Sequence, residues 1–375
     1  MPTYTLNNVN YTYTVGTVAA SVGVSASASG SITLLSSFVV DGATYNVTSI
    51  AASAFLNKTG LTSVTIPDSV TTIGDAAFSG CITLTTLTIP NSVTTINQYL
   101  CESCRGLTSI TLPNTVTSIG SYAFYYCTGL TAFTLPASLI IVGTAPFTGC
   151  SNIANFIIKS NTLNSTIGSI LPNNPIGISI TFDYVGSITA TNLWVIANFN
   201  NLIISPNIIS IAGSAFINCL MKTVTISDTV TSIGGDAFNN CINLTTVTLP
   251  NGLTTIINNL FKFCYKLTTV TIPSTVTSIS DGAFSYSGIE SINIPNVTSI
   301  GLSAFESSAL KSVNLPSVIT ITEKAFYNCR NLESVTLSTV FTTWNGPAGF
   351  QQCPKLANVV IKSLPGCGIL QQMNS

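Results

Sequence analysis

The chain has 375 residues, of which only 6% are charged, and its formal net charge is −1. An ordinary soluble domain has about 25% charged residues, so Thr, Ser and Asn must take the place of Lys and Glu on this surface. So small a charge excludes the electrostatic attraction on which binding to nucleic acid or to an anionic membrane depends. No apolar run is long enough for a membrane-spanning helix. We therefore expect neither nucleic-acid binding nor membrane insertion.

Residues 1–45 follow no repeat and predict a β-rich cap. The stretch YTLNNVNYTYTV at residues 4–15 is rich in β-branched and aromatic residues and predicts a strand. Asp41-Gly42 predicts a tight turn. A stack of repeats must cover its apolar end, which explains a divergent N-terminal segment. The N-terminus has no basic region followed by an apolar one, so it does not read as a secretory signal.

A 23-residue repeat organises the rest of the chain. Its first full copy is LTSVTIPDSVTTIGDAAFSGCIT at residues 61–83. Further copies begin at Leu84, Leu107, Leu130, Met221, Leu244, Leu267, Ile289, Leu310, Leu332 and Leu356. A fixed period of this size is typical of stacked coils that each contact only their neighbours. Counting the Phe-type turns predicts about 14 coils.

Each copy predicts the same local structure. Apolar positions 1, 4 and 6 indicate a short parallel strand, which the proline at position 7 ends because it cannot donate to the ladder. The glycine at position 14, Gly74 in the first copy, is expected to permit a tight bend. Position 18 predicts an internal aromatic column: Phe55, Phe78, Phe124, Phe147, Phe216, Phe238, Phe261, Phe284, Phe305, Phe326 and Phe350.

Nine of the eleven cysteines occupy position 21: Cys81, Cys104, Cys127, Cys150, Cys219, Cys241, Cys264, Cys329 and Cys353. This regular spacing indicates buried small hydrophobic side chains and not a disulfide framework. Cys101 and Cys104 form a C-x-x-C pair, which is also found in metal and redox sites. Cys101 stands in the Phe position, however, so packing is the favoured interpretation.

The repeat lapses between residues 153 and 201 but keeps its phase, because Phe147 and Phe216 lie 69 residues, or three repeats of 23, apart. We expect a mainly β, right-handed solenoid with no inserted domain. The expected segments are an N-terminal cap at 1–45, repeats at 46–152, degenerate repeats at 153–201, repeats at 202–361 and a C-terminal cap or tail at 362–375.

Histidine is absent from the sequence. The commonest general base, nucleophile activator and metal ligand are therefore missing. The twelve carboxylates show no obvious pairing, and no glycine-rich phosphate loop follows a strand. We expect no enzyme activity, no catalytic residues, no cofactor and no metal.

Positions 3 and 5 of each repeat carry Thr or Ser and should face outward from the sheet. These hydroxyls suit an exposed sheet. They could also form a neutral docking face for a protein or glycan, or an ice-binding Thr array. Near the C-terminal end Glu290, Lys311 and Glu333 share position 2, beside Asn293 and Asn314. They predict either an exposed charge ladder of small energetic value or a patch that faces a partner.

Aromatic residues between the Phe and Cys positions vary from copy to copy and should lie on one loop edge. They include Tyr125, Tyr126, Tyr286 and Tyr327. The pair Lys262-Phe263 occupies the same positions in another copy of the repeat. Exposed aromatic side chains of this kind can anchor a partner protein. They can equally fold over neighbouring coils.

The repeat at residues 61–83 and 221–243 resembles the consensus of the BspA-like leucine-rich repeats, LTSITIPDSVTSIGDYAFSGCTS, almost letter for letter. SFVVDGATYNVTSIAASAF at residues 37–55 also resembles the first segment of that family. The resemblance covers residues 38–152 and 202–361. It implies a curved solenoid with a parallel sheet on its concave face, and it implies no catalytic residues.

The resemblance also implies surface proteins that adhere to host or matrix proteins, found in bacteria, parasitic protists and large DNA viruses. The first functional hypothesis is a surface adhesion or attachment module with a protein partner. The second is a structural component of a larger assembly, such as a virion or filament, with self-association. The resemblance favours an extracellular surface or a virion as the location.

Overall fold

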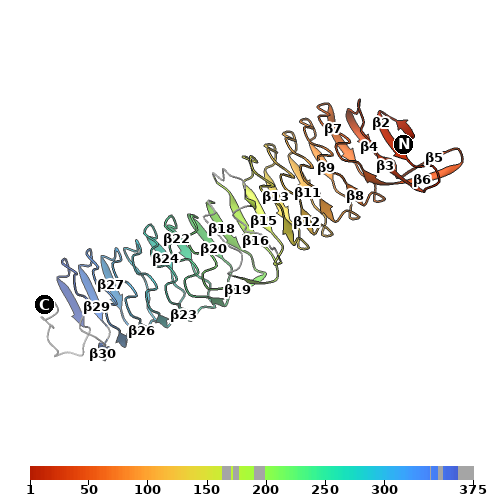
Figure 1. Ribbon diagram of the computed structural model, residues 1–375. Helices are drawn as coiled ribbons and strands as arrows, with labels where there is room; N and C mark the ends of the chain where they lie inside the picture. Colours follow the sequence, from red (N-terminus) through yellow and green to blue (C-terminus); the bar gives the residue numbers. More distant parts are fainter. Residues whose placement is uncertain (163–169, 172–176, 190–198, 338, 345–348, 362–375) are drawn as a thin grey trace. The chain divides into compact units, whose positions relative to one another are not determined.

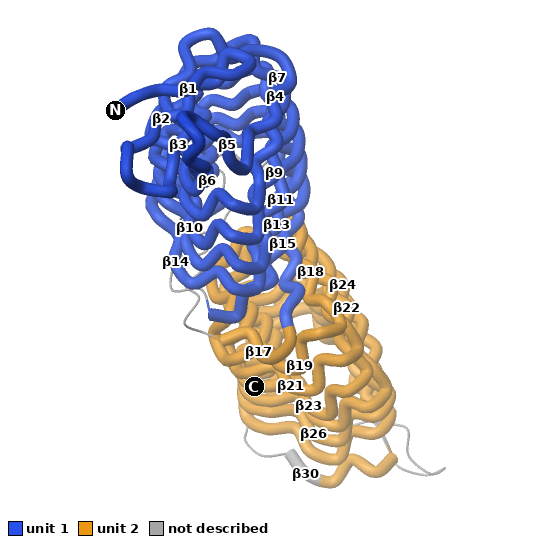
Figure 2. The backbone as a smooth tube through the Cα atoms, turned by 90° about the vertical axis from the view of Figure 1, so that its right-hand side faces the viewer, with its two compact units in different colours: residues 1–184 blue, residues 185–375 orange. Residues whose placement is uncertain are grey.

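The computed structural model describes residues 1–162, 170–171, 177–189, 199–337, 339–344 and 349–361. The chain forms two compact units, Met1–Tyr184 and Val185–Ser375, which Figure 2 distinguishes by colour. The described residues form strands and turns of a mainly β, parallel-strand solenoid of about 14 turns. None of its described helical segments is both long and apolar enough to cross a membrane.

The first unit begins with the expected β-rich cap. Its sheet has the order β1-β2-β3-β6-β5, and β8 pairs with β6. The strands are β1 Thr3–Leu6, β2 Val9–Tyr13, β3 Ala19–Val22, β5 Ser37–Val40, β6 Ala43–Ile50 and β8 Thr72–Ile73. The Asp41-Gly42 turn is confirmed, since both residues have positive φ and join β5 to β6.

One expectation for the cap was wrong in detail. Residues 4–15 do not form one strand but an antiparallel hairpin of β1 and β2. Asn7 and Asn8 turn the chain, with φ of 48° and 64°. Asn tolerates this left-handed conformation better than most residues, which is why the chain reverses there.

Long strands of the first unit stack in parallel, one per coil (Figure 1). They are β4 Gly30–Thr33, β7 Leu61–Thr65, β9 Thr86–Thr88, β11 Ser109–Thr111, β13 Ala132–Leu135, β15 Asn155–Ile158 and β16 Ser179–Phe182. A second row of short strands contains β10 Thr95–Ile96, β12 Ser118–Ile119 and β14 Ile141–Val142. The registers advance by 23 residues, as from Leu87 to Ile110.

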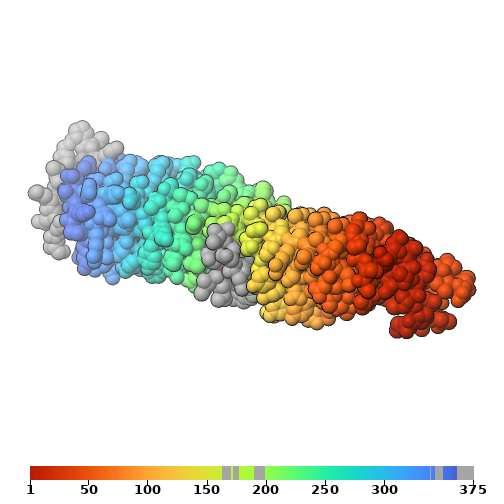
Figure 3. All heavy atoms as spheres, turned by 90° about the horizontal axis from the view of Figure 1, so that it is seen from above, coloured from red at the N-terminus to blue at the C-terminus, as the bar shows by residue number. Residues whose placement is uncertain are grey.

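The second unit repeats the plan. Its long strands are β18 Asn201–Ile204, β20 Thr223–Ile226, β22 Thr246–Thr248, β24 Thr269–Thr271, β27 Ser312–Leu315, β29 Ser334–Leu337 and β31 Asn358–Ile361. Its second row contains β17 Gly186–Ile188, β19 Ile208–Ile211, β21 Ser232–Ile233, β23 Thr255–Ile256, β25 Ser278–Ile279, β26 Ser299–Ile300, β28 Thr320–Ile321 and β30 Thr343–Trp344. Within each unit the colours of Figure 3 follow sequence order, as expected when each coil packs on the next.

The predicted aromatic column is confirmed inside each unit. Phe55 and Phe78 stack with ring centroids 5.3 Å apart, and Phe124 stacks on Phe147 at 5.4 Å. In the second unit the stack runs without interruption from Phe216 to Phe350, with spacings of 5.1 to 5.8 Å. Burial of each ring contributes roughly 1.5–3 kcal/mol, so the column is a main source of cohesion between coils.

The glycine at position 14 has a different role from the one expected. Gly74, Gly120 and Gly234 do not have positive φ. A Cβ at Gly120 would lie 2.5 Å from the backbone nitrogen of Gln98 in the preceding coil. In the coils that carry it, this glycine therefore allows the close approach of the preceding coil, whereas other coils have Asn97, Ile257 or Ser280 at the same position.

The expected degenerate coils lie partly in residues 163–169, 172–176 and 190–198, outside the described residues. In the described part of this segment, β15 pairs with β13 and with β16 in parallel. The proposed segment boundaries and the C-terminal cap at 362–375 stay predictions.

Candidate functional site: the loop edge

A typical coil has one long strand and one short strand of the second row. A turn runs from the end of that short strand to the start of the long strand of the next coil. We call these turns together the loop edge. It comprises residues 75–85, 98–108, 121–131 and 144–154 in the first unit, and 213–222, 235–245, 258–268, 281–290, 302–311, 323–333 and 349–357 in the second.

The backbone of the loop edge has an unusual and regular conformation. Positions 16 and 20 of each coil adopt positive φ, as at Tyr122 (57°) and Tyr126 (55°), and at Asn259 (54°) and Phe263 (61°). A left-handed residue other than glycine costs roughly 1–2 kcal/mol. Hydrogen bonds to the next coil offset this cost: Tyr122 N donates to Thr144 O at 3.0 Å, and Tyr126 N donates to Thr148 O at 2.8 Å.

Four tyrosines gather on the loop edge of the first unit. Tyr99 stacks on Tyr122 with centroids 5.3 Å apart, and Tyr125 meets Tyr122 and Tyr126 edge to face at 5.5 and 4.5 Å. Tyr126 is 43% exposed. Its ring lies on Gly149 of the next coil, where a Cβ would come within 2.9 Å of the ring.

One carboxylate, Glu102, lies close to this cluster. Glu102 accepts a hydrogen bond from the Ser79 hydroxyl at 3.2 Å. Lost solvation, the adjacent Tyr126 and, to a smaller degree, Glu102 raise the pKa of Tyr125. The cluster therefore presents apolar ring surface and hydrogen-bonding groups side by side, which suits recognition of a partner.

A second aromatic group lies on the loop edge of the other unit and lines a cavity of about 360 Å³. The rings of Phe263 and Tyr286 are 5.2 Å apart and inclined at 37°. The Lys262 ammonium lies 5.2 Å from the Phe263 centroid. Asp281 and Glu306 contribute carboxylates to the same lining.

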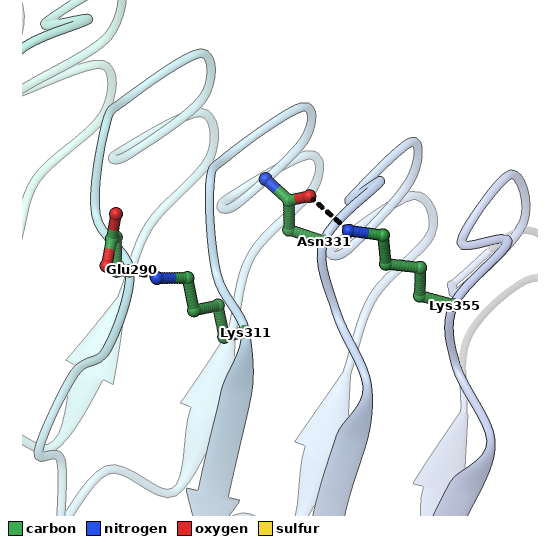
Figure 4. Close-up of polar contacts among 4 residues, drawn as sticks. All are labelled: Glu290, Lys311, Asn331 and Lys355. Atoms are coloured by element: carbon green, nitrogen blue, oxygen red, sulfur yellow. Dashed lines mark hydrogen bonds and ion pairs between the residues drawn. The ribbon is translucent and has the colours of Figure 1, made fainter.

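Charged side chains of the second unit are concentrated on the loop edge as well. The described cations there are Lys222, Lys262, Lys266, Lys311, Lys324, Arg330 and Lys355. The expected pairing of opposite charges is present between Lys311 and Glu290, whose Nζ and Oε2 are 2.6 Å apart (Figure 4). Lys355 likewise reaches back one coil to Asn331, at 3.1 Å.

The remaining candidate residues lie near this pair. Glu333 is exposed and its backbone N donates to Lys311 O, but among the described side chains no ion pair joins it to Lys311. Asn293 and Asn314 are exposed and form a parallel bridge on the strand face. Tyr327 is half-buried on the loop edge of the following coil.

Sequence reasoning missed several members of both aromatic groups. Tyr99 and Tyr122 occupy position 16, and Asp281 and Glu306 occupy positions 15 and 19. Their places in the repeat were the available signal, because position 16 is itself left-handed and positions 15 and 19 are next to the left-handed residues at 16 and 20.

The position-21 thiols have a structural role beyond filling space. Eight of the nine donate to the carbonyl of the Phe position in the preceding coil, as Cys104 does to Phe78 O and Cys127 to Cys101 O, at 3.0 and 2.9 Å. Burial raises the pKa of Cys81 and Cys264 to about 12. The ten described cysteines are free and buried. This arrangement agrees with the packing interpretation of Cys101-x-x-Cys104, and the described residues contain no cluster suited to a metal ion.

Threonine hydroxyls also connect the coils. Thr85 and Thr108 at position 2 each donate to the backbone carbonyl of the same position in the preceding coil, at 3.2 and 3.4 Å. Thr117 at position 11 does likewise. Positions 3 and 5, such as Thr86 and Thr88, remain exposed on the strand face.

The model of the BspA type leucine rich repeat region matches residues 48–170, 188–310 and 277–366, with six copies. Among solved structures, the chain is similar to a leucine-rich repeat protein from Bacteroides ovatus at 22% identity, covering 95% of this chain and 94% of that one with a TM-score of 0.43. It is similar to a leucine rich cell surface protein from Faecalibacterium prausnitzii at 22% identity, covering 97% and 96% with a TM-score of 0.35. It is also similar to the pneumococcal vaccine antigen PcpA at 16% identity, covering 97% and 99% with a TM-score of 0.37. No curated protein matches the chain.

Proposed function

The chain belongs to the BspA-type leucine-rich repeat family, and on that premise we propose that it is a non-enzymatic, protein-binding scaffold for surface attachment. The observation that supports this function most is the kind of side chains that the loop edge carries. Exposed aromatic side chains and most of the charges of the described chain lie there, whereas the strand face carries mainly Thr and Ser. Aromatic residues at the centre of a patch supply most of the binding energy in many protein interfaces.

The partner is a host or matrix protein that contacts two groups of residues. The first group consists of the loop-edge tyrosines Tyr125, Tyr126, Tyr286 and Tyr327. The second consists of the charged and amide residues Glu290, Asn293, Lys311, Asn314 and Glu333. The Lys311–Glu290 pair is half-exposed on both sides, so it contributes little to stability and is available to a partner.

Surface plasmon resonance of the full chain against a panel of matrix and plasma proteins tests this function. We expect at least one partner to bind, and Tyr126→Ala or Tyr286→Ala to weaken binding by about thirtyfold or more, as for a hot-spot residue. Thr248→Ala on the strand face is the matched control and should bind as the native chain does. Equal loss in all three variants, or no binding to any panel member, would contradict the proposal.

A second candidate function is that of a subunit in a larger assembly. The uncharged strand face supports it, because neutral surfaces repel one another less than charged ones. Sedimentation velocity over a range of concentrations distinguishes the two. A monomer at every concentration favours attachment to another protein, whereas discrete larger species favour assembly.

A further inference from the structure

We propose that the cavity beside Phe263 and Tyr286 is a binding site for a neutral sugar, a hexose or a short chain of hexoses. This proposal goes beyond the protein-binding role proposed above, with which it shares Tyr286. The cavity of about 360 Å³ lies at the low end of the range for ligand pockets, about 300–1,000 Å³. One or two sugar rings fit such a volume.

Gly282 brings two neighbouring coils close together beside the cavity. Gly282 forms part of its lining with a φ of +62°, and a Cβ there would collide with Oδ1 of Asn259 from the preceding coil. The backbone of Gly282 therefore lies directly against Asn259 of the preceding coil, with no space for a side chain at Gly282. No other described coil carries this set of side chains at the same turn.

The lining combines two features that a sugar ring requires. Phe263 and Tyr286 offer ring surface on which the apolar C–H face of a pyranose can stack, and Tyr286 is 37% exposed. We expect the stacking of a sugar on an aromatic ring to contribute to the free energy of binding about as much as an aromatic pair does. Asp281, Glu306 and Lys262 offer acceptors and a donor around the same hollow.

The mixed charges of the lining suit a ligand that has many hydroxyl groups. The lining carries two carboxylates and one ammonium, and Lys262 already lies over the Phe263 ring. A hydroxyl can donate to a carboxylate and accept from an ammonium, so a polyol satisfies all three groups. Asp281 is held in place by the backbone N–H of Leu302, which donates to its Oδ1 at 2.7 Å.

Saturation-transfer NMR followed by titration calorimetry tests the site, with the full chain and a panel of glucose, galactose, mannose, N-acetylglucosamine and their β-linked disaccharides. We expect at least one member to bind with a millimolar Kd. Tyr286→Ala should weaken that binding about tenfold, whereas Tyr286→Phe should change it less than about threefold because the ring is kept.

Thr248→Ala is the control, since Thr248 is exposed on the strand face and is not part of the cavity lining, and its sugar binding should equal that of the native chain. Three results would overturn the proposal: no panel member binds, Tyr286→Ala binds as the native chain does, or a lysine-rich peptide binds at Tyr286 while the sugars do not. Circular dichroism of each variant establishes that a loss of binding is not a loss of fold.

Discussion

At the scale of single residues, the position-21 thiol shows how side-chain chemistry is matched to the stack. A thiol at this place is long enough to reach the carbonyl of the preceding coil, at about 3 Å in eight coils. Two coils have Ser instead, Ser287 and Ser308, and both lack one residue in the following turn. Ser287 Oγ is buried and has no hydrogen-bond partner in the described structure.

Ser287→Cys should therefore stabilise the chain. The longer C–S bond lets the thiol approach Phe261 O, as the position-21 thiols of other coils approach the carbonyls of their preceding coils. The exchange also removes a buried hydroxyl without a hydrogen bond, which costs about 1–3 kcal/mol. We expect a rise of about 1 kcal/mol in the free energy of unfolding, measured by urea denaturation. The reverse exchange one coil earlier, Cys264→Ser, should lower it. If Ser287→Cys destabilises as much as Cys264→Ser does, the thiol–carbonyl contact is not the reason for cysteine.

Buried thiols also predict how stability depends on pH. Burial raises the pKa of Cys81 and Cys264 from 9.0 to about 12. Well below pH 9 the two thiols are protonated in the folded and in the unfolded chain, so their contribution to the free energy of unfolding is fully present. Above pH 9 these thiols ionise in the unfolded chain but stay protonated in the folded chain. The free energy of unfolding therefore falls as pH rises toward 12.

Thermal unfolding between about pH 6 and pH 10.5 measures this effect. We expect a nearly constant melting temperature up to about pH 8.5 and a decline beyond it. The double variant Cys81→Val, Cys264→Val should show a shallower decline, which separates the thiols from the tyrosines and lysines that titrate in the same range. Identical slopes for the two proteins would contradict the assignment.

At the scale of elements, the repeat spacing predicts the strands, the aromatic column and the cysteine ladder because those features depend on burial, which apolar periodicity reports. Phe238 and Leu244, for example, are fully buried as their positions predict. The left-handed residues at positions 16 and 20 could not be predicted in this way. Tyr126 and Phe263 have no propensity for positive φ, and bonds to the next coil impose it.

The position-14 glycine gives a prediction for the close approach of coils. A Cβ at Gly234 would collide with the backbone of Gly213, whereas one at Gly252 would meet its nearest neighbours at an ordinary 3.5 Å. Gly234→Ala should cost about 1–3 kcal/mol through overpacking. Gly252→Ala should be neutral or slightly stabilising. Chemical denaturation of both variants measures the difference, and similar values for the two would show that coil spacing is not the constraint.

The aromatic column predicts a graded response to truncation. Phe238 stacks between Phe216 and Phe261 at 5.4 and 5.8 Å. Phe238→Ala should cost about 3–5 kcal/mol, and Phe238→Leu less because it leaves a smaller cavity. Hydrogen exchange should show the largest loss of protection in the two adjacent coils, because each coil depends on its neighbours. A uniform loss across Val185–Ser375 would contradict nearest-neighbour coupling.

At the scale of the whole molecule, the sequence predicts the solenoid and the absence of an obvious reaction centre more readily than it predicts a partner. The sequence places Tyr125 and Tyr126 on the loop edge of the first unit and Tyr286 and Tyr327 on that of the second, because the repeat sets their positions. The cavity at Phe263 and Tyr286 was not foreseen, because it depends on side chains from three successive coils and on Gly282. Such a combination leaves no periodic pattern in the sequence.

The central claim is that the scaffold binds its partner through the loop edge and the adjoining Asn293 and Asn314, and not through the Thr and Ser residues of the strand face. Hydrogen–deuterium exchange of the chain with and without a bound panel protein tests it most directly. The account predicts new protection in peptides covering 121–131, 258–268 or 281–290, with no change in β9, β11, β22 or β24. Protection confined to those strands, with the loop-edge peptides unchanged, would contradict it.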